Sequence, residues 1–190
     1  MKTSTILFFD TSQVGAGVLL SREGSKYTLH AYQTIKFGTT EGDAALEALF
    51  TAAAAIKHGH NEKTGVSAEQ PCGYDRRGLS IRAKANGVIG VLQSYARRFE
   101  LPWRGEIAPG TAKKALTGDG RAQKPAMVWY ANIIFGLTLK LPADEHAADA
   151  CGGAMAALSG QYIVRNCGGR TTKAFKEKQR EPKGPQGRLL

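Results

Sequence analysis

The chain has 190 residues, enough for one domain with a substantial core, and 42% of them are hydrophobic, as in ordinary globular proteins. No stretch approaches the roughly 20 apolar residues of a membrane span, and the run ILFF near the start is too short for a signal peptide. The sequence therefore predicts neither a membrane protein nor a secreted one. Its three cysteines, Cys72, Cys151 and Cys167, lack metal-ligand spacing and indicate a reducing compartment.

The net charge of +10 is high, and more than half of it lies at the C-terminus. Residues 165–190 hold eight basic and two acidic side chains, together with several glycines and prolines. We predict a folded domain over 1–163 and a basic, disordered tail over 164–190. Such a tail suits a polyanion such as nucleic acid, and a role in solubility is the alternative.

The first third of the chain predicts three consecutive strands. The segment TILFFDT (5–11) is mostly apolar, as in a central strand buried on both faces. VGAGVLL (14–20) follows after a short turn, and YTLHAYQTI (27–35) alternates apolar and polar residues like an outer strand. The alanine-rich segment 42–59 then predicts a helix, with Gly59 as its C-cap.

The rest of the chain alternates short strands with helices. Strands are expected at 65–70 and 104–108, and helices at 79–99, 111–118, 122–136 and about 145–163. Gly118 closes the third helix, Pro125 fits only in the first turn of the fourth, and Asp144 is a good N-cap for the last. Gly87 and Gly90 indicate that the second helix approaches another backbone closely.

This order of elements predicts an α/β protein with a five-stranded mixed sheet and helices on both faces. Three strands in sequence followed by two crossover strands is the layout of the ribonuclease H-like fold. In that fold the first and fourth strands are neighbours.

Four side chains that can bind metal are expected to converge at one edge of this sheet. Asp10 ends the first strand and Glu69 ends the fourth. His146 and Asp149 are three residues apart, so they share the helix face that can point at the two acids. Three carboxylates and one imidazole suit Mg²⁺ or Mn²⁺, and two such ions can clamp a phosphate ester during hydrolysis.

Each of the four has a plainer interpretation when it is taken alone. An aspartate like Asp10 also ends the first strand of actin-like ATPases and dehydrogenases, and Glu69 could lie on the surface. His146 could be a hydrogen-bonded structural histidine, and Asp149 could simply favour the positive end of a helix. The order, the spacing and the type of element agree only when the four are read together.

The motifs around these residues resemble the RuvC-type Holliday junction resolvases, including phage-borne members. The resemblance is carried by FFDTSQVGAGV (8–18), by SAEQP (67–71) with Gly87 eighteen residues after Glu69, by APGTAKKALTGDGRAQK (108–124) and by LPADEHAADACGGAMAA (141–157). It covers roughly residues 5 to 160.

The resemblance implies a metal-dependent endonuclease that acts as a homodimer and nicks two opposed strands of a four-way DNA junction. In this chain Asp10, Glu69, His146 and Asp149 would hold two catalytic ions, Mg²⁺ or Mn²⁺. Lys124 would lie near the scissile phosphate. It also implies the cytoplasm of a bacterial or phage-infected cell, in association with nucleoid DNA.

Further contacts with DNA are expected from two basic segments. Lys113 would hold the substrate backbone, with Lys114 beside it, although both could be ordinary surface lysines. In PCGYDRRGLSIR (71–82), Tyr74 could stack on a base, displaced by about two positions from the aromatic residue of the family. Three arginines of the same segment could hold phosphates, or the segment could be an ordinary solvated loop. These are Arg76, Arg77 and Arg82.

Two departures from the family pattern bear on the function. The sequence DTS (10–12) replaces the more usual Asp-Pro-Gly and resembles the opening of actin-fold carbamoyl-transfer proteins. His146 stands where many members have an acid, and its softer imidazole favours Mn²⁺ over Mg²⁺.

His58 and His60 have no partners at zinc spacing and are interpreted as a helix end and loop.

Three other functions therefore remain open. The first is an actin-like partner protein without nuclease action, although no clear phosphate-binding loop follows the three strands. The second is a DNA-binding module that keeps the fold but not the chemistry. The third is a related nuclease that cuts flaps or replication forks.

Overall fold

The computed structural model of the chain describes residues 3–56, 64–71 and 78–162, without the side chains of Thr3 and of residues 78–82. A five-stranded sheet in the order β3-β2-β1-β4-β5 forms its centre. The strands are β1 (Thr3–Phe9), β2 (Val14–Glu23), β3 (Lys26–Lys36), β4 (Gly65–Glu69) and β5 (Trp103–Ile107). β1 pairs antiparallel with β2 and β2 with β3, whereas β4 runs parallel to both β1 and β5. The predicted mixed sheet is confirmed.

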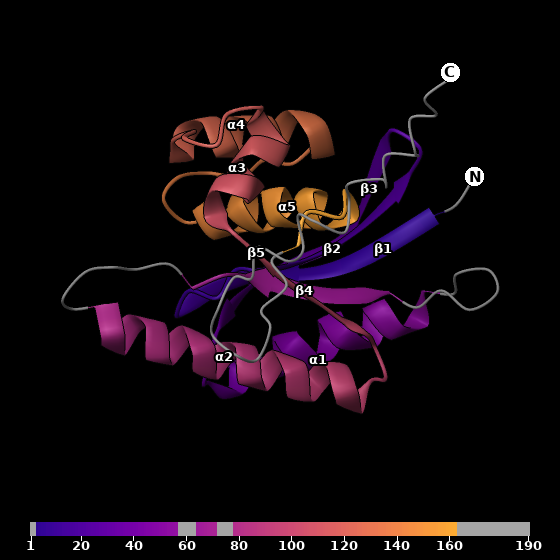
Figure 1. Cartoon of the computed structure of the whole chain (residues 1–190), viewed down its shortest axis with the longest axis vertical. Helices are drawn as coiled ribbons and strands as arrows, with labels where there is room; N and C mark the ends of the chain where they lie inside the picture. Colours follow the sequence, from indigo (N-terminus) through magenta and orange to yellow (C-terminus); the bar gives the residue numbers. More distant parts are fainter. Residues whose placement is uncertain (1–2, 57–63, 72–77, 163–190) are drawn as a thin grey trace, which may run out of the picture.

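Helices cover both faces of the sheet, as Figure 1 shows. One face carries α1 (Thr40–Ala55) and α2 (Gly78–Arg98). The other carries α3 (Pro109–Thr117), α4 (Lys124–Phe135) and α5 (Glu145–Leu158). The chain thus has the three layers that the sequence predicts.

The central strand β1 supplies both cores. Ile6 and Phe8 are buried in the cluster that includes α5, while Leu7 and Phe9 are buried in the cluster that includes α1 and α2. Successive side chains of a strand point to opposite faces, so a continuous apolar run is what this position requires.

The parallel pairing of β1 with β4 brings the two predicted acids together. The register pairs Phe9 with Ala68, so Asp10 and Glu69 follow at the same edge of the sheet. The hydroxyl of Thr11 donates a hydrogen bond of 3.4 Å to the carbonyl of Glu69 across this edge. The two strand ends are therefore held side by side.

Two glycines let α5 pack closely on its neighbours. A Cβ atom at Gly153 would overlap the ring of Phe8, and one at Gly152 would lie 2.7 Å from the carbonyl oxygen of Ala112 in α3. The small side chains that follow His146 and Asp149 therefore allow α5 to lie directly against β1 and α3.

Two of the predicted helix ends agree with the structure, and others differ from it. Gly118 ends α3 with a φ of 83°, and Pro125 lies in the first turn of α4. Asp144 precedes α5 but does not cap it with its side chain, which instead accepts a hydrogen bond from the backbone N–H of Lys140. α5 ends at Leu158, earlier than expected, and Gly160 follows with a φ of 74°.

The expectation for the glycines of α2 is wrong within the described residues. A Cβ atom at Gly87 or Gly90 would meet nothing within 4 Å there. The sequence predicts that the first helix runs to a C-cap at Gly59, whereas α1 ends at Ala55 with Ile56 as its C-cap. Two other predictions, the histidines at 58 and 60 and the tail over 164–190, concern residues that the structure does not describe.

The outer side of α4 is apolar and exposed. Trp129 is 58% exposed and Ile133, one turn later, is 59% exposed. The buried side of the same helix contributes Met127, Val128 and Ala131. Among the described helices, none is long and apolar enough to cross a membrane.

Candidate metal centre

Asp10 is the buried carboxylate of the predicted site. It is only 3% exposed at the end of β1, where a charge is costly unless it is hydrogen-bonded or paired. Its Oδ1 accepts hydrogen bonds from the backbone N–H of Ser12 at 2.9 Å and from the Ser12 hydroxyl at 2.8 Å. The turn after β1 therefore fixes the orientation of this carboxylate.

His146 contacts Asp10 directly, as predicted from its place on α5. Its Nδ1 lies 2.6 Å from Asp10 Oδ2, and because a carboxylate only accepts, Nδ1 is the donor. This hydrogen bond raises the pKa of His146, outweighing the opposite effect of burial. In the neutral ring, Nε2 would then be free to bind a cation, an arrangement common among histidines that ligate metals.

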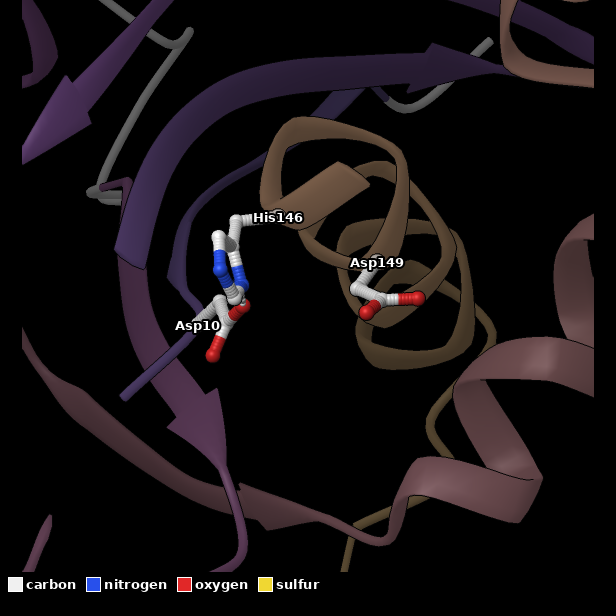
Figure 2. A group of neighbouring side chains, drawn as sticks. All are labelled: Asp10, His146 and Asp149. Carbon is white, nitrogen blue, oxygen red and sulfur yellow. Dashed lines mark hydrogen bonds and ion pairs between the residues drawn. The ribbon is translucent and has the colours of Figure 1, made fainter. Parts of the chain in front are cut away.

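Asp149 projects from the same helix one turn further along (Figure 2). Its Oδ2 accepts a hydrogen bond from the ammonium of Lys124, while its buried Oδ1 has no hydrogen-bond partner among the described residues. Burial raises the pKa of Asp149 even though the bond to Lys124 acts in the opposite direction. Burial alone would lower the pKa of Lys124, but the bond to Asp149 and the charges of Glu145 and Asp10 raise it overall.

Together these side chains offer a compact set of ligand atoms. Atoms of Asp10, His146 and Asp149 lie within 4.8 Å of one another. Figure 2 shows the ring of His146 directed at Asp10, with Asp149 facing the same space from the next turn of α5. The spacing of three residues therefore does bring the histidine and the aspartate of one helix face to the end of β1.

Glu69 is the fourth predicted ligand and lies beside this set rather than within it. Burial, followed by the charges of Asp10 and Asp149, raises the pKa of Glu69 to about 8. The nearby lysines Lys124 and Lys113 lower it only in part. Neighbouring negative charge that raises the pKa of Glu69 and of Asp149 is the usual electrostatic sign of a site for cations.

The residues present fit a hard divalent cation. The donor set is rich in oxygen, with a single imidazole. Asp149 Oδ1 is a buried acceptor without a partner among the described residues, and the clustered negative charge is balanced only in part by Lys124. Coordination by Asp149 would satisfy that oxygen and relieve the repulsion among the acids.

Lys113 and Lys124 share a small cavity with two of the acids. The cavity has a volume of about 190 Å³, and its lining includes Glu69, Asp149 and both lysines. Lys124 begins α4, where free backbone N–H groups favour an anion. Lys114 is exposed and does not line this cavity.

The other predicted DNA contacts cannot be placed. Tyr74, Arg76 and Arg77 lie outside the described residues, and Arg82 belongs to α2 with its side chain not described.

Two polar residues of the site do not feature in the sequence prediction. Ser12 holds Asp10 through an i to i+2 hydrogen bond, for which the pattern Asp-x-Ser was an available signal. Glu145 lies 3.9 Å from the ammonium of Lys124 and 3.8 Å from His146 Nε2. Its place at the start of α5 gave no comparable signal.

The sequence is similar to that of a known nuclease. No family model matches the chain. The crossover junction endodeoxyribonuclease RuvC of Treponema denticola is 32% identical over 85 residues, which are 45% of this chain and 40% of that protein. The matched segment thus spans less than half of the relative's length.

Solved structures match over a larger part of the chain. The structure of Thermus thermophilus RuvC matches with a TM-score of 0.56 and 18% identity, over 83% of this chain and 95% of that one. Thermus thermophilus RuvC in complex with a Holliday junction substrate matches with a TM-score of 0.50 and 19% identity, over 85% and 98%. The ribonuclease H-like fold is therefore confirmed, as is the resemblance of the chain to RuvC.

Proposed function

We propose that this chain is a RuvC-type crossover junction endodeoxyribonuclease, which hydrolyses phosphodiester bonds of four-way DNA junctions with the help of divalent cations. The observation that carries the proposal is the convergence of Asp10, His146 and Asp149, beside Glu69, at one edge of a sheet shared with RuvC. Similarity in sequence to a RuvC protein supports the same reaction class.

The four residues would hold Mg²⁺ or Mn²⁺, and we propose two ions. Bound there, the cations would lower the pKa of the attacking water and neutralise charge on the phosphate and the leaving oxygen. Ser12 keeps the carboxylate of Asp10 in place for this role, and the hydrogen bond that His146 Nδ1 donates to Asp10 leaves Nε2 as the ligand atom.

Two lysines would bind the DNA next to the acids. Lys124 lines the cavity that contains Glu69 and Asp149, which supports a role in which its ammonium would donate to an oxygen of the scissile phosphate. Lys113, from α3, would hold a neighbouring phosphate of the same strand. Both contacts neutralise backbone charge without reading the base sequence.

We also propose, from the resemblance to RuvC, that the chain acts as a homodimer, whose two sites cut opposed strands of one symmetric substrate. Lys114, Tyr74, Arg76, Arg77 and Arg82 would add contacts to the branched DNA. The DNA would be that of a bacterial or phage-infected cell, and the protein would act in its cytoplasm.

The decisive experiment compares substrates and variants in one panel. A mobile four-way junction, a fork, a flap and a linear duplex are incubated with the protein and either Mg²⁺ or Mn²⁺. Asp10→Asn, Glu69→Gln and Asp149→Asn test the ligands. Glu41→Gln, which alters an exposed acid at the start of α1, is the matched control.

We expect the wild type and Glu41→Gln to cut the four-way junction with paired nicks. Each ligand variant should lose cutting by more than about 100-fold, the scale seen when a group that stabilises transition-state charge is removed. Junction binding should persist in these variants, because losing a carboxylate reduces its repulsion with DNA. Equal cutting by wild type and Asp10→Asn would contradict the proposal.

The same panel separates the alternatives. Junction binding that needs no metal, with no cuts under either ion, would indicate a DNA-binding module. Preferred cutting of forks or flaps would indicate a related nuclease. Nucleotide binding measured by calorimetry, without affinity for DNA, would favour the actin-like partner protein.

A further inference from the structure

Glu145 lies at the edge of the metal centre, and the proposed function gives it no role. It is the first residue of α5, directly before His146, and its side chain is 28% exposed. Among the described residues its carboxylate forms no hydrogen bond and has two ionisable partners, Lys124 and His146. The carboxylate is therefore free to bind something else.

A single oxygen of Glu145 faces both partners. Its Oε1 lies 3.9 Å from the ammonium of Lys124 and 3.8 Å from Nε2 of His146. Because Nδ1 of His146 donates to Asp10, Nε2 is the ring nitrogen left for a cation. Glu145 Oε1 therefore lies next to an atom that would bind the metal.

The distance between these two atoms fits two ligands of one ion. Octahedral ligands lie about 2.1 Å from Mg²⁺, so two of them are about 3 Å apart when adjacent and about 4.2 Å apart when opposite. The 3.8 Å between Glu145 Oε1 and His146 Nε2 falls between these values. Glu145 lies outside the group whose atoms are within 4.8 Å of one another, so it would approach the cation from the side of Nε2.

The charge of the site favours a further carboxylate. The three carboxylates proposed as ligands carry three negative charges when ionised, and the neutral ring of His146 carries none. Two divalent cations carry four positive charges, and the number of charged ligands sets the affinity of such sites. Asp149 Oδ1, buried and without a partner among the described residues, points independently to a cation at this place.

We propose that Glu145 is a fifth ligand residue of the metal centre: its Oε1 binds the cation held by His146 Nε2 and supplies the negative charge that the imidazole lacks. The inference rests on the metal centre of the proposed function. The plainer role for Glu145 is to stabilise the start of α5, because a negative charge is favourable at a helix N-terminus.

A matched pair of variants separates the two roles. Glu145→Ala removes the carboxylate and leaves no oxygen in its place. Glu41→Ala makes the same change in the first turn of α1, where the acid is exposed. Both variants lose a favourable charge at a helix N-terminus, so in EDTA both should unfold at similar urea concentrations. Only Glu145→Ala should change the binding of a cation.

The first measurement is Mn²⁺ binding to the full chain without DNA, followed through the paramagnetic resonance signal of free Mn²⁺. Glu41→Ala should bind like wild type. Glu145→Ala should bind at least about tenfold more weakly, since even residues that only contact a metal ligand typically change affinity by 10- to 100-fold. The relaxation of solvent protons then counts the waters on bound Mn²⁺, and Glu145→Ala should gain one water where the carboxylate was.

The second measurement moves the charge by one residue. His146→Asp places a carboxylate where the imidazole was, so Glu145 should then matter less. In that background Glu145→Ala should weaken Mn²⁺ binding by less than about threefold, because residues that share one ion are not additive. A loss of the same size in both backgrounds would contradict the inference.

The outcomes separate this inference from the proposed function. Equal Mn²⁺ affinities and equal water counts for Glu145→Ala and Glu41→Ala, while wild type binds Mn²⁺, would overturn the inference alone. Failure of wild type to bind Mn²⁺ would overturn the metal centre, and with it both proposals. A wild type that binds Mn²⁺ through Glu145 but cuts no junction would contradict the proposed function only.

Discussion

Glu69 makes the pH dependence of the folded state predictable. Burial and the charges of Asp10 and Asp149 raise its pKa to about 8, from about 4.5 in an unfolded chain. The folded protein therefore binds more protons than the unfolded one between these values. Stability without metal should fall by a few kcal/mol as the pH rises from about 5 to about 8, because the charged form is disfavoured in the fold.

This prediction is checked by urea denaturation in EDTA across that pH range. Glu69→Gln should flatten the pH dependence, whereas Glu41→Gln should leave it as in wild type. Because a ligand must be deprotonated to bind metal, the gain in stability with Mn²⁺ should grow with pH in wild type. A free energy of unfolding that rises toward pH 8 in EDTA would contradict the assigned environment of Glu69.

At the scale of elements, the contact of α5 with β1 determines where His146 and Asp149 lie. A methyl group at Gly153 would overlap the ring of Phe8, which is fully buried in the core. Gly153→Ala should therefore destabilise the fold by about 1–3 kcal/mol, the usual cost of overpacking. It should also weaken Mn²⁺ binding, because α5 must move away from Asp10.

The control for this change is Gly90→Ala in α2. A methyl group there meets open space among the described residues, so it should stabilise the helix by about 0.5–1 kcal/mol. Both variants are compared by thermal unfolding with and without Mn²⁺. Equal stability of Gly153→Ala and wild type would show that α5 can shift without cost.

The elements themselves were largely predictable, because their signals are local. The strand at 5–11 is a continuous apolar run, and the structure places β1 there with both of its faces buried. The cap at Asp144 was less predictable, since its side chain binds the N–H of Lys140 instead of the helix. The end of α5 was predicted too late, although Gly160 marked the turn.

The sequence could predict the metal centre but not the larger cavity beside it. Asp10, His146 and Asp149 could be grouped from sequence because a strand end and one helix face define their positions. The cavity of about 450 Å³ whose wall includes Ser12 could not be predicted in this way, because its lining takes Phe37, Asp43 and Lys84 from three separate parts of the chain. None of these residues carries a motif of its own.

For the whole molecule, the charge of the last 26 residues gives a further prediction. Residues 165–190 carry eight basic and two acidic side chains, and we predict contacts with DNA phosphates of low specificity. Each phosphate contact adds about 0.9 to the slope of log affinity against log salt concentration. Deleting 165–190 should weaken junction binding and reduce that slope by roughly 2 or more.

The control for the deletion is a chain whose last 26 residues are permuted without a change of composition. Because the expected contacts depend on charge, the permuted chain should keep the wild-type slope. Binding is measured by fluorescence anisotropy over a range of salt concentrations. A slope unaffected by the deletion would show that this segment does not bind the DNA backbone.

The exposed side of α4 has a practical consequence. The chain contains two tryptophans: Trp129 is 58% exposed, whereas Trp103 lies partly buried against the core beneath α1 and α2. Indole emission shifts to shorter wavelength when water leaves the ring, so the two side chains report on different events. Replacing Trp103 with phenylalanine would leave Trp129 as the single tryptophan. The wavelength of its emission maximum would then report when another molecule covers α4.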